Sequence, residues 1–574
     1  MATGLLAAAL LSPLPAAAKI EVTIPEVSEA IQTNVRAFLS LTRYADRDDV
    51  TDEVMSRLQR RIVTETRQAL EPLGYYEPNV TYDVVKQGEL WKVTIHIEPG
   101  RPVRLSEVSV NVTGPGAEDR AIRELLEAEE IKPGLRLNHG TYERVKGNLV
   151  RVAKNEGYLD AKLTKHDLVI DRTERRATVD LEADTGERYS FGEINIAQDV
   201  ITDESMRRLL RMHPGDPYTL DTLLRTQYVL DDTQYFSVVD IESGDPDRAT
   251  RTVPITVTAE PSRKHRYAAA VGYGTDTKAR GKFTWDNRRV NESGHKFKLE
   301  LLGSSIVTDL TGRYIVPVMD IALEKLEFTG TLRDEELGDT QSERAEVGAG
   351  LTQVLGRWQR VLQVRLSDET TTEADGEKST NFYLVPSVSY STLPSYIVGG
   401  RKRPYFFSAE LRGSPETLGS DASFLQLRMK GERIFDMSDL WHLHLRSELG
   451  VSRIAATSDL PASQRFFAGG EGSVRGFALN ELSPRDEEGR SIGGRNLATG
   501  TIEIVRDLPR NFGVAAFYDI GNAFDDFDDP QLEYSAGLGV RYNIAVASFG
   551  VDVAQALSES GRSPRFHLYI ATQF

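Results

Sequence analysis

The residues best placed to do chemistry together surround one arginine, Arg475, in a glycine-rich stretch, Arg465–Phe477. Four of the eight residues 469–476 are glycine, so the backbone can fold tightly where a Cβ would clash. A solvated loop has little need for this composition, and we expect the stretch to fold back into an interior. A planar guanidinium can hold two carboxylates at once, so the predicted chemistry is ion pairing and not catalysis.

Two strand-like segments downstream of the loop supply carboxylates. Because side chains alternate along a strand, each segment has two faces. One face is apolar and suits lipid; it consists of Ile502, Ile504, Tyr518 and Ile520. The opposite face carries Glu503, Phe517, Asp519 and Gly521. We therefore expect Arg475 to bridge Glu503 and Asp519, with Gly521 leaving room for the loop to approach.

The second half of the chain supplies an interior for the loop. From Lys264 onward, segments of about ten residues alternate between polar and apolar and are separated by turn residues, which is typical of strands that cross a membrane. We count sixteen such strands. The prediction is an antiparallel transmembrane β-barrel over residues 263–574, with its apolar face toward lipid and an in-folded loop at 460–496.

The ends of the predicted barrel form its seam. Glycine weakens a strand, and the first strand contains Gly272 and Gly274. The last strand ends on an aromatic residue, Phe574. We expect the seam to join these two strands.

The first half of the chain repeats. Leu105–Val110 is echoed 86 residues later by Phe191–Ile196. Strand, two helices and two strands follow one another in each unit, which predicts three α+β domains. Their predicted bounds are 19–102, 103–187 and 188–262. Such units leave sheet edges free, and a free edge can pair with an extended chain. Binding and simple spacing remain equally open as roles for the array.

The composition limits the kinds of partner and ligand that the protein can bind. The net charge of −17 argues against nucleic acid, because phosphate contact needs a basic face. The absence of cysteine removes disulfides, thiolate metal sites and cysteine nucleophiles. We predict no cofactor, no metal and no catalytic residue. Residues 1–18 have an apolar core and a small-residue cleavage site, as expected of a signal peptide.

Two short motifs lie at defined places in the predicted barrel. Val474-Arg475-Gly476-Phe477 lies between the predicted eleventh and twelfth strands, and Phe517–Gly521 lies on the thirteenth. With the terminal aromatic, they resemble the outer-membrane insertase superfamily, which includes BamA, TamA and the two-partner secretion transporters. The repeats resemble polypeptide-transport-associated (POTRA) domains. The resemblance implies that the loop folds into the lumen as a lid and that its arginine packs on strands twelve and thirteen.

Within that superfamily, three POTRA units and about 570 residues resemble the TamA branch. This implies an outer-membrane location with POTRA domains in the periplasm. It also implies no enzymatic activity, a TamB-like periplasm-spanning partner, contact with lipid and lipopolysaccharide, and nascent barrel proteins such as autotransporters as substrates. A BamA-like general insertase and a two-partner exporter are alternatives within the superfamily. A passive channel or receptor is the alternative of another class.

Overall fold

The computed structural model describes residues 20–45, 47, 50–88, 90–128, 131–373, 375–393, 405–544 and 547–572. The predicted signal peptide and Phe574 lie outside these residues. The chain forms two compact units: Met1–Asn195 with Met212–Leu224 and Glu242–Thr256, and Ile196–Arg211 with Arg225–Ile241 and Val257–Phe574. None of the helices described is long and apolar enough to cross a membrane.

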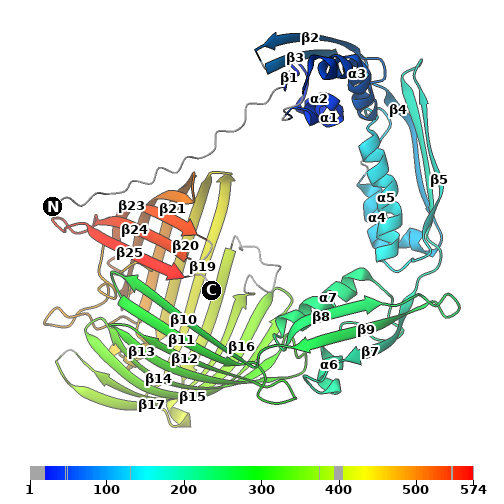
Figure 1. Cartoon of the computed structure of the whole chain (residues 1–574). Helices are drawn as coiled ribbons and strands as arrows, with labels where there is room; N and C mark the ends of the chain where they lie inside the picture. The colour runs from blue at the N-terminus through cyan, green and yellow to red at the C-terminus, as the bar shows by residue number, and fades with distance from the viewer. Residues whose placement is uncertain are drawn as a thin grey trace, which may run out of the picture. The chain divides into compact units, whose positions relative to one another are not determined.

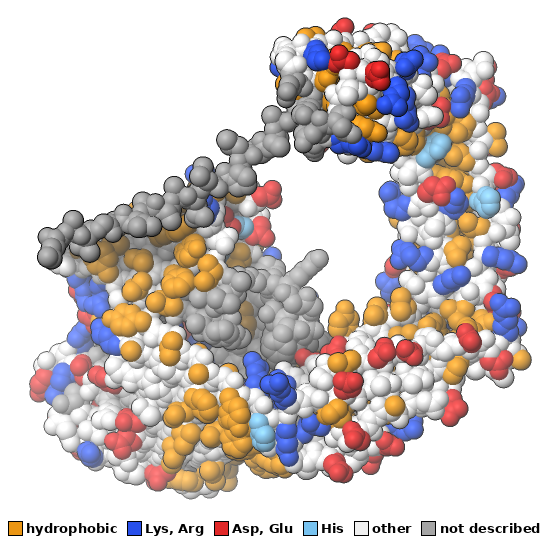
Figure 2. Space-filling view, viewed as in Figure 1, with side chains coloured by type: hydrophobic (Ala, Val, Ile, Leu, Met, Phe, Trp, Pro, Cys, Tyr) orange, Lys and Arg blue, Asp and Glu red, His pale blue; other side chains and the backbone are white. Residues whose placement is uncertain are grey.

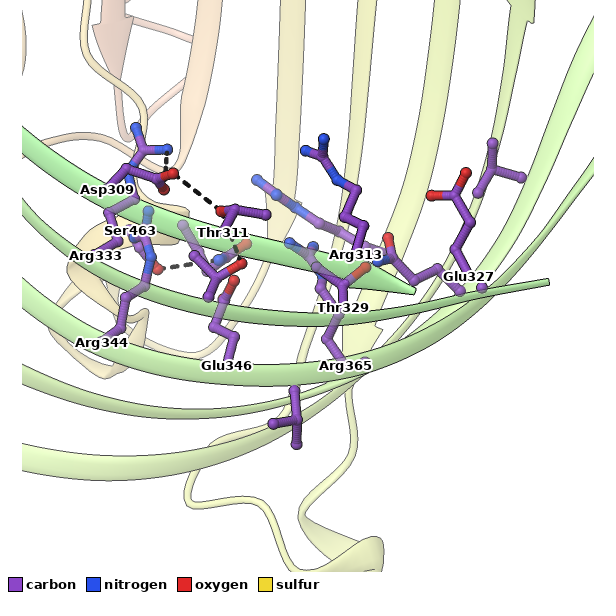
Figure 3. Close-up of a pocket in the computed structure, with 18 of the residues that line it drawn as sticks. Asp309, Thr311, Arg313, Glu327, Thr329, Arg333, Arg344, Glu346, Arg365 and Ser463 are labelled. Atoms are coloured by element: carbon purple, nitrogen blue, oxygen red, sulfur yellow. Dashed lines mark hydrogen bonds and ion pairs between the residues drawn. The ribbon is translucent and has the colours of Figure 1, made fainter. Parts of the chain in front are cut away.

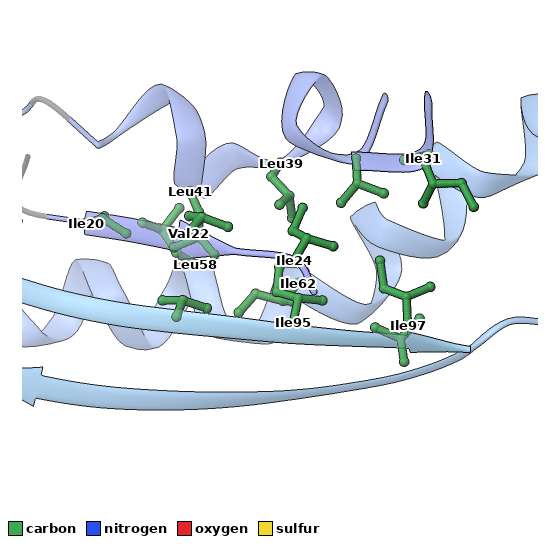
Figure 4. Packing of buried hydrophobic residues seen from close by; sticks show 14 of the residues in the cluster. Ile20, Val22, Ile24, Ile31, Leu39, Leu41, Leu58, Ile62, Ile95 and Ile97 are labelled. Carbon is green, nitrogen blue, oxygen red and sulfur yellow. The ribbon is translucent and has the colours of Figure 1, made fainter. Parts of the chain in front are cut away.

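The first small domain is a three-stranded sheet under helices. Its elements are β1 (Ile20–Thr23), α1 (Glu29–Phe38), α2 (Ser40–Arg43), α3 (Asp52–Leu70), β2 (Asn79–Gln87) and β3 (Leu90–Glu98). The Thr51 side chain caps α3 by accepting a hydrogen bond from the Val54 backbone N–H. Met55 and Ile62 lie on one face of α3 and are fully buried against the sheet, whose order is β1-β3-β2. Figure 4 shows this apolar layer between helix and sheet.

Two further domains repeat the plan. The second consists of β4 (Arg104–Thr113), α4 (Arg120–Glu127), α5 (His139–Asn155), β5 (Lys162–Asp171) and β6 (Arg176–Asp184), with sheet order β4-β6-β5. The third consists of β7 (Ser190–Ala197), α6 (Asp203–Leu209), α7 (Leu220–Asp232), β8 (Phe236–Ser243) and β9 (Thr252–Pro261), with sheet order β7-β9-β8. The β-α-α-β-β order predicted from the sequence is confirmed, with the short α2 as an addition in the first domain.

Equivalent glycines form the joins between these domains. Gly74 has φ +86°, and its carbonyl accepts a 2.8 Å hydrogen bond from the Val103 N–H. Gly157 has φ +93°, and its carbonyl accepts a 2.9 Å bond from the Tyr189 N–H. A Cβ at Gly157 would lie 2.3 Å from the Tyr218 carbonyl oxygen, so only glycine fits there. The join is thus a backbone contact that the sequence repeats.

The remaining sixteen strands close into one antiparallel barrel, in chain order from β10 to β25 (Figure 1). They are β10 (His265–Gly274), β11 (Lys278–Asn287), β12 (Lys296–Gly303), β13 (Val307–Pro317), β14 (Lys325–Leu337), β15 (Thr340–Leu355), β16 (Trp358–Thr372), β17 (Lys378–Thr392), β18 (Tyr405–Ser414), β19 (Phe424–Ser438), β20 (Trp441–Arg453), β21 (Asn496–Leu508), β22 (Phe512–Phe524), β23 (Glu533–Ile544), β24 (Ala547–Ala556) and β25 (Arg565–Thr572). The predicted strand number is confirmed.

The barrel is apolar outside and polar inside. Large apolar side chains that alternate along the strands are exposed on its outer face, among them Phe283, Leu301, Leu310, Phe328 and Val347. Figure 2 shows such side chains gathered over the barrel strands. Charged side chains such as Glu300, Glu369 and Asp552 face inward and are buried. Strands with this alternation suit a barrel wall that has lipid on one side and a polar lumen on the other.

The second unit also contains contacts between the barrel and residues that follow α6 and α7. Arg211 makes two hydrogen bonds of 2.7 and 2.9 Å to the carboxylate of Asp320, in the turn between β13 and β14. The Tyr235 hydroxyl donates to the carbonyl of Gly294, before β12. A bidentate ion pair and a buried tyrosine hydrogen bond anchor this part of the third domain to the barrel turns.

Candidate functional site

The long connection between β20 and β21 lies inside the barrel. Phe466, Ala468, Val474 and Phe477 from this loop form a buried cluster with Leu497, Ala523 and Ala556 of the barrel wall. At Gly469, φ is +100° and a Cβ would lie 2.2 Å from the Ala478 carbonyl oxygen. The loop can therefore double back on itself only with glycine there.

Arg475, at the tip of this loop, contacts both carboxylates named from the sequence. Its Nε and Nη2 donate to the two oxygens of Asp519, at 2.8 and 3.0 Å. Its Nη1 donates to Glu503 Oε2 at 2.7 Å. Asp519 is fully buried and Arg475 is 3% exposed, so these charges are removed from water and depend on each other.

Two residues that the sequence reasoning missed complete the charge balance. Arg475 Nη1 also lies 3.2 Å from Asp552 Oδ2, on β24. Arg541, on β23, bonds to Asp552 and, at 3.3 Å, to Glu503. Two arginines and three carboxylates thus form one network, which we call the clamp around Arg475. Asp552 alternates with outward Val551 and Val553, so the alternation that revealed Asp519 could have revealed it too.

The neighbours of Arg475 in the loop are also fixed. Its guanidinium carbon lies 3.3 Å from the centre of the Phe517 ring, a cation–π contact. The Gly476 N–H donates to Ser535 Oγ at 3.2 Å, and a Cβ at Gly476 would lie 2.7 Å from the Cβ of Ser535. Phe477 is fully buried, with the guanidinium of Arg562 over its ring. The motif Val474–Phe477 therefore lies against the wall along its whole length.

Gly521 has a different neighbour from the one expected. A Cβ there would lie 2.5 Å from the Ala498 carbonyl oxygen and 2.7 Å from the Thr499 Cα, both on β21. The close approach that Gly521 permits is that of the adjacent strand, and the expectation that it makes room for the loop is corrected. The other three predicted partners, Glu503, Phe517 and Asp519, contact Arg475 directly.

The seam between β10 and β25 is short. Among the described residues only two pairs face each other, Tyr273 with Ile570 and Gly274 with Tyr569. By contrast, β10 faces β11 over ten pairs and β24 faces β25 over eight. A Cβ at Gly272 would lie 3.1 Å from the Ile570 carbonyl oxygen, so this glycine also lies at the seam.

The loop contacts both sides of that seam. The Glu471 N–H donates to Asp276 Oδ2 at 2.8 Å, in the turn after β10. His567, on β25, hydrogen-bonds through Nε2 to the Arg475 carbonyl, and its Nδ1 lies 3.7 Å from Asp276 Oδ2. Burial disfavours the charge of Asp276, but His567 and the Glu471 N–H outweigh it and lower the pKa of that carboxyl. Hydrogen bonds and a histidine–carboxylate contact therefore join the loop to both sides of the seam.

A barrel with an in-folded loop and three preceding sheet-and-helix domains defines a class, POTRA-bearing outer-membrane proteins. Residues 216–574 match the Omp85 superfamily domain, and residues 21–99 match the first POTRA domain of TamA. The chain belongs to the Omp85 superfamily. This membership and the apolar outer face of the barrel indicate an outer-membrane location.

Curated relatives agree with this assignment, and a solved structure shares the fold. Outer membrane protein assembly factor BamA of Nitratidesulfovibrio vulgaris is 24% identical over 360 residues, which are 59% of this chain and 45% of that protein. BamA of Neisseria meningitidis serogroup B is 30% identical over 115 residues, 18% of this chain and 14% of that protein. The chain thus spans less than half the length of these relatives. The crystal structure of BamA from Haemophilus ducreyi lacking POTRA domains 1–3 shares the fold, with a TM-score of 0.65, 14% identity, and coverage of 82% of this chain and 99% of that one.

Proposed function

We propose that this protein inserts β-barrel proteins, autotransporters among them, into the outer membrane through the seam between β10 and β25. The observation that carries the proposal is the pairing of these strands, which covers two residue pairs among the described residues. A strand edge that lacks a partner is a template for another strand. Among the strand contacts that the structure describes, the seam has the fewest residue pairs, and we place the opening there.

Substrate folding would supply the driving force. A strand in lipid must satisfy every backbone N–H and C=O within protein, so each strand added at the seam gains partners that the bilayer cannot offer. No catalytic residue is needed for this step. The clamp around Arg475 would stiffen β21, β22 and β24 while the seam beside them opens, since it bonds the loop to Glu503, Asp519 and Asp552.

The three POTRA domains would lie in the periplasm and receive substrates and partners. The match of residues 21–99 to a TamA-type POTRA domain favours a TamB-like protein as the partner that spans the periplasm. The sheet edges β1, β2, β4 and β5 each have a neighbour on one side only, so they can accept an extended segment. Lipid and lipopolysaccharide would surround the barrel.

A BamA-like general insertase is the second candidate, favoured by the curated relatives, which are described as outer membrane protein assembly factors. Purification of the tagged protein from membranes separates the two. Copurification of a TamB-like protein supports the first candidate, whereas a set of assembly lipoproteins supports the second. A two-partner exporter would instead retain a secreted protein.

The seam itself is tested by a reversible crosslink. The chain has no cysteine, so Tyr273→Cys with Ile570→Cys introduces one defined pair. Facing residues of antiparallel strands lie about 4.5–5.5 Å apart, within the range of a disulfide. We expect the oxidised protein to lose insertion of a barrel substrate into liposomes, and reductant to restore it.

A second crosslink serves as the matched control. Leu301→Cys with Leu310→Cys joins β12 to β13, which face each other over eight pairs away from the seam. This crosslink should leave insertion unchanged. Full activity with a locked seam would refute lateral insertion, and a large ion conductance without any insertion would favour a passive channel.

A further inference from the structure

The barrel lumen contains a second group of charged residues, apart from the clamp around Arg475. It lines a cavity of about 890 Å³ between the inner faces of β12–β16, β18 and β19 and the loop residues 463–467. Figure 3 shows Arg313, Arg333, Arg344 and Arg365 on neighbouring strands of this cavity, with Thr311 and Thr329 among them.

The charge of this cavity is opposite to that of the protein. Nine of the residues that line it are basic and four are acidic, although the whole chain has a net charge of −17. The basic residues are Lys298, Arg313, Lys325, Arg333, Arg344, Arg365, Arg412, Arg428 and Arg465. Seven of these basic residues pair with a carboxylate, four of them with Glu300, Glu373 or Glu448, which do not line the cavity. The local excess of positive charge therefore rests on the remaining two, Arg365 and Arg412, and the low-dielectric walls focus their field.

The basic residues that line the cavity differ in their partners. Lys325 pairs with Glu327, and Arg428 pairs with Glu448. Arg365 has neither an ion pair nor a hydrogen bond to any residue that the structure describes, and its Nε is buried. Arg412 donates through Nε and Nη2 to Gln426 Oε1, a neutral acceptor.

Arg365 and Arg412, which have no ion pair within the described residues, lie close to each other and to two paired arginines. Arg412 is within electrostatic reach of Arg344, Arg365 and Arg428, with Glu410 as the acidic residue nearby. Arg344 shares Glu335 with Arg333, and its Nη1 is buried without a partner among the described residues. Glu346 also lines the cavity but makes no ion pair within the described residues. Guanidinium groups this close repel one another, and several of their N–H donors still lack acceptors.

We propose that this cavity binds a phosphate group, held by Arg344, Arg365 and Arg412. A phosphate ester or inorganic phosphate carries up to two negative charges and at least three acceptor oxygens, so it can satisfy several guanidinium forks at once. A single carboxylate offers one negative charge and two oxygens, so it leaves part of the positive charge of the arginines unneutralised. The group could belong to free phosphate or to a lipid head group, which share this chemistry.

The test measures phosphate binding by the full chain in detergent, by isothermal titration with inorganic phosphate at constant ionic strength. The double variant Arg365→Gln with Arg412→Gln removes the two cations without carboxylate partners. Because hydrogen bonds from charged groups contribute to the free energy of phosphate binding, the affinity of the double variant for phosphate should fall at least about tenfold. Unchanged heat-modifiability of the variant in gel electrophoresis would show that its barrel still folds.

Lys430→Gln is the matched control. Lys430 also pairs with Glu448, 3.3 Å away, but does not line the cavity. Its loss lowers the charge of the barrel by one and leaves Glu448 paired with Arg428. We expect its phosphate affinity to change by less than about twofold. An equal loss in the control and the double variant would refute a specific site, and so would the absence of saturable binding by the unaltered protein.

A second titration identifies the source of the phosphate group. Competition by dihexanoyl phosphatidic acid for the same site supports a lipid head group, and its failure to compete supports a free ion. Neither result depends on insertion activity. A locked seam that remains active would refute the proposed function while leaving the phosphate site intact.

Discussion

Two groups of arginines face the barrel lumen, and they differ in what neutralises them. Arg475 meets Asp519, Glu503 and Asp552 directly, and it is 3% exposed. Arg365 and Arg412 face a cavity and have no carboxylate within ion-pair distance among the described residues. The first group is complete without any ligand, so its role is structural. The second group is incomplete, which is why we assign it a ligand.

Removal of the Arg475 side chain should have the largest effect. Arg475→Ala leaves Glu503 and Asp552 with Arg541, and leaves the fully buried Asp519 without a cationic partner among the described residues. Breaking a buried ion pair costs about 3–5 kcal/mol. We expect the free energy of unfolding in urea to fall by that amount, and heat-modifiability to be lost at a lower temperature. An unchanged unfolding curve would mean that the clamp does not stabilise the barrel.

Arg475→Lys tests the shape of the group separately from its charge. Lysine keeps the positive charge but cannot reproduce the paired bonds from Nε and Nη2 to Asp519. The expected loss of stability is about 2 kcal/mol, the contribution of a charged hydrogen bond. A loss equal to that of Arg475→Ala, in the same urea titration, would show that fork geometry and not charge governs the network.

Phe517→Leu should cost less again. The substitution keeps an apolar side chain under the guanidinium but removes the aromatic face, 3.3 Å away. A desolvated cation–π contact contributes about 2 kcal/mol, part of which the leucine retains through packing. In the Arg475→Ala background the cation is already absent, so Phe517→Leu should there lower the free energy of unfolding in urea by less than it does in the unaltered protein. If the losses from the two substitutions simply add, the cation–π contact does not contribute to stability.

Arg365→Gln should have the smallest effect in buffer without phosphate. No described partner is lost and repulsion with Arg412 is relieved, so the free energy of unfolding should change by less than about 0.5 kcal/mol. Added phosphate should stabilise the unaltered protein more than the variant, because a ligand bound to the folded state raises stability according to its affinity. Thermal unfolding with and without phosphate measures both. A large loss of stability in buffer without phosphate would show that Arg365 has a structural role, like Arg475.

Much of the structure follows from periodicity. Alternation placed Glu503 and Asp519 inside and Ile502 and Tyr518 outside, and the structure has them so. The same alternation counted sixteen strands, because a strand that separates lipid from a polar lumen must change polarity at every residue.

Other features needed the register of distant strands. The sequence does not say that Arg541 meets Glu503 and Asp552, since that depends on how β21, β23 and β24 align across the closed barrel. It placed Gly521 correctly on the inner face but assigned the wrong neighbour, because a close backbone approach by β21 has no signature of its own.

By itself the sequence determined which residues face the lumen, how many strands and repeats there are, and that Arg475 lies in a loop suited to an interior. These are local properties that period, turn residues and glycine content specify. The tertiary structure alone decided which charges meet. Arg475 and Arg365 are both arginines of the same barrel, and only barrel closure places three carboxylates beside the one and a cavity beside the other.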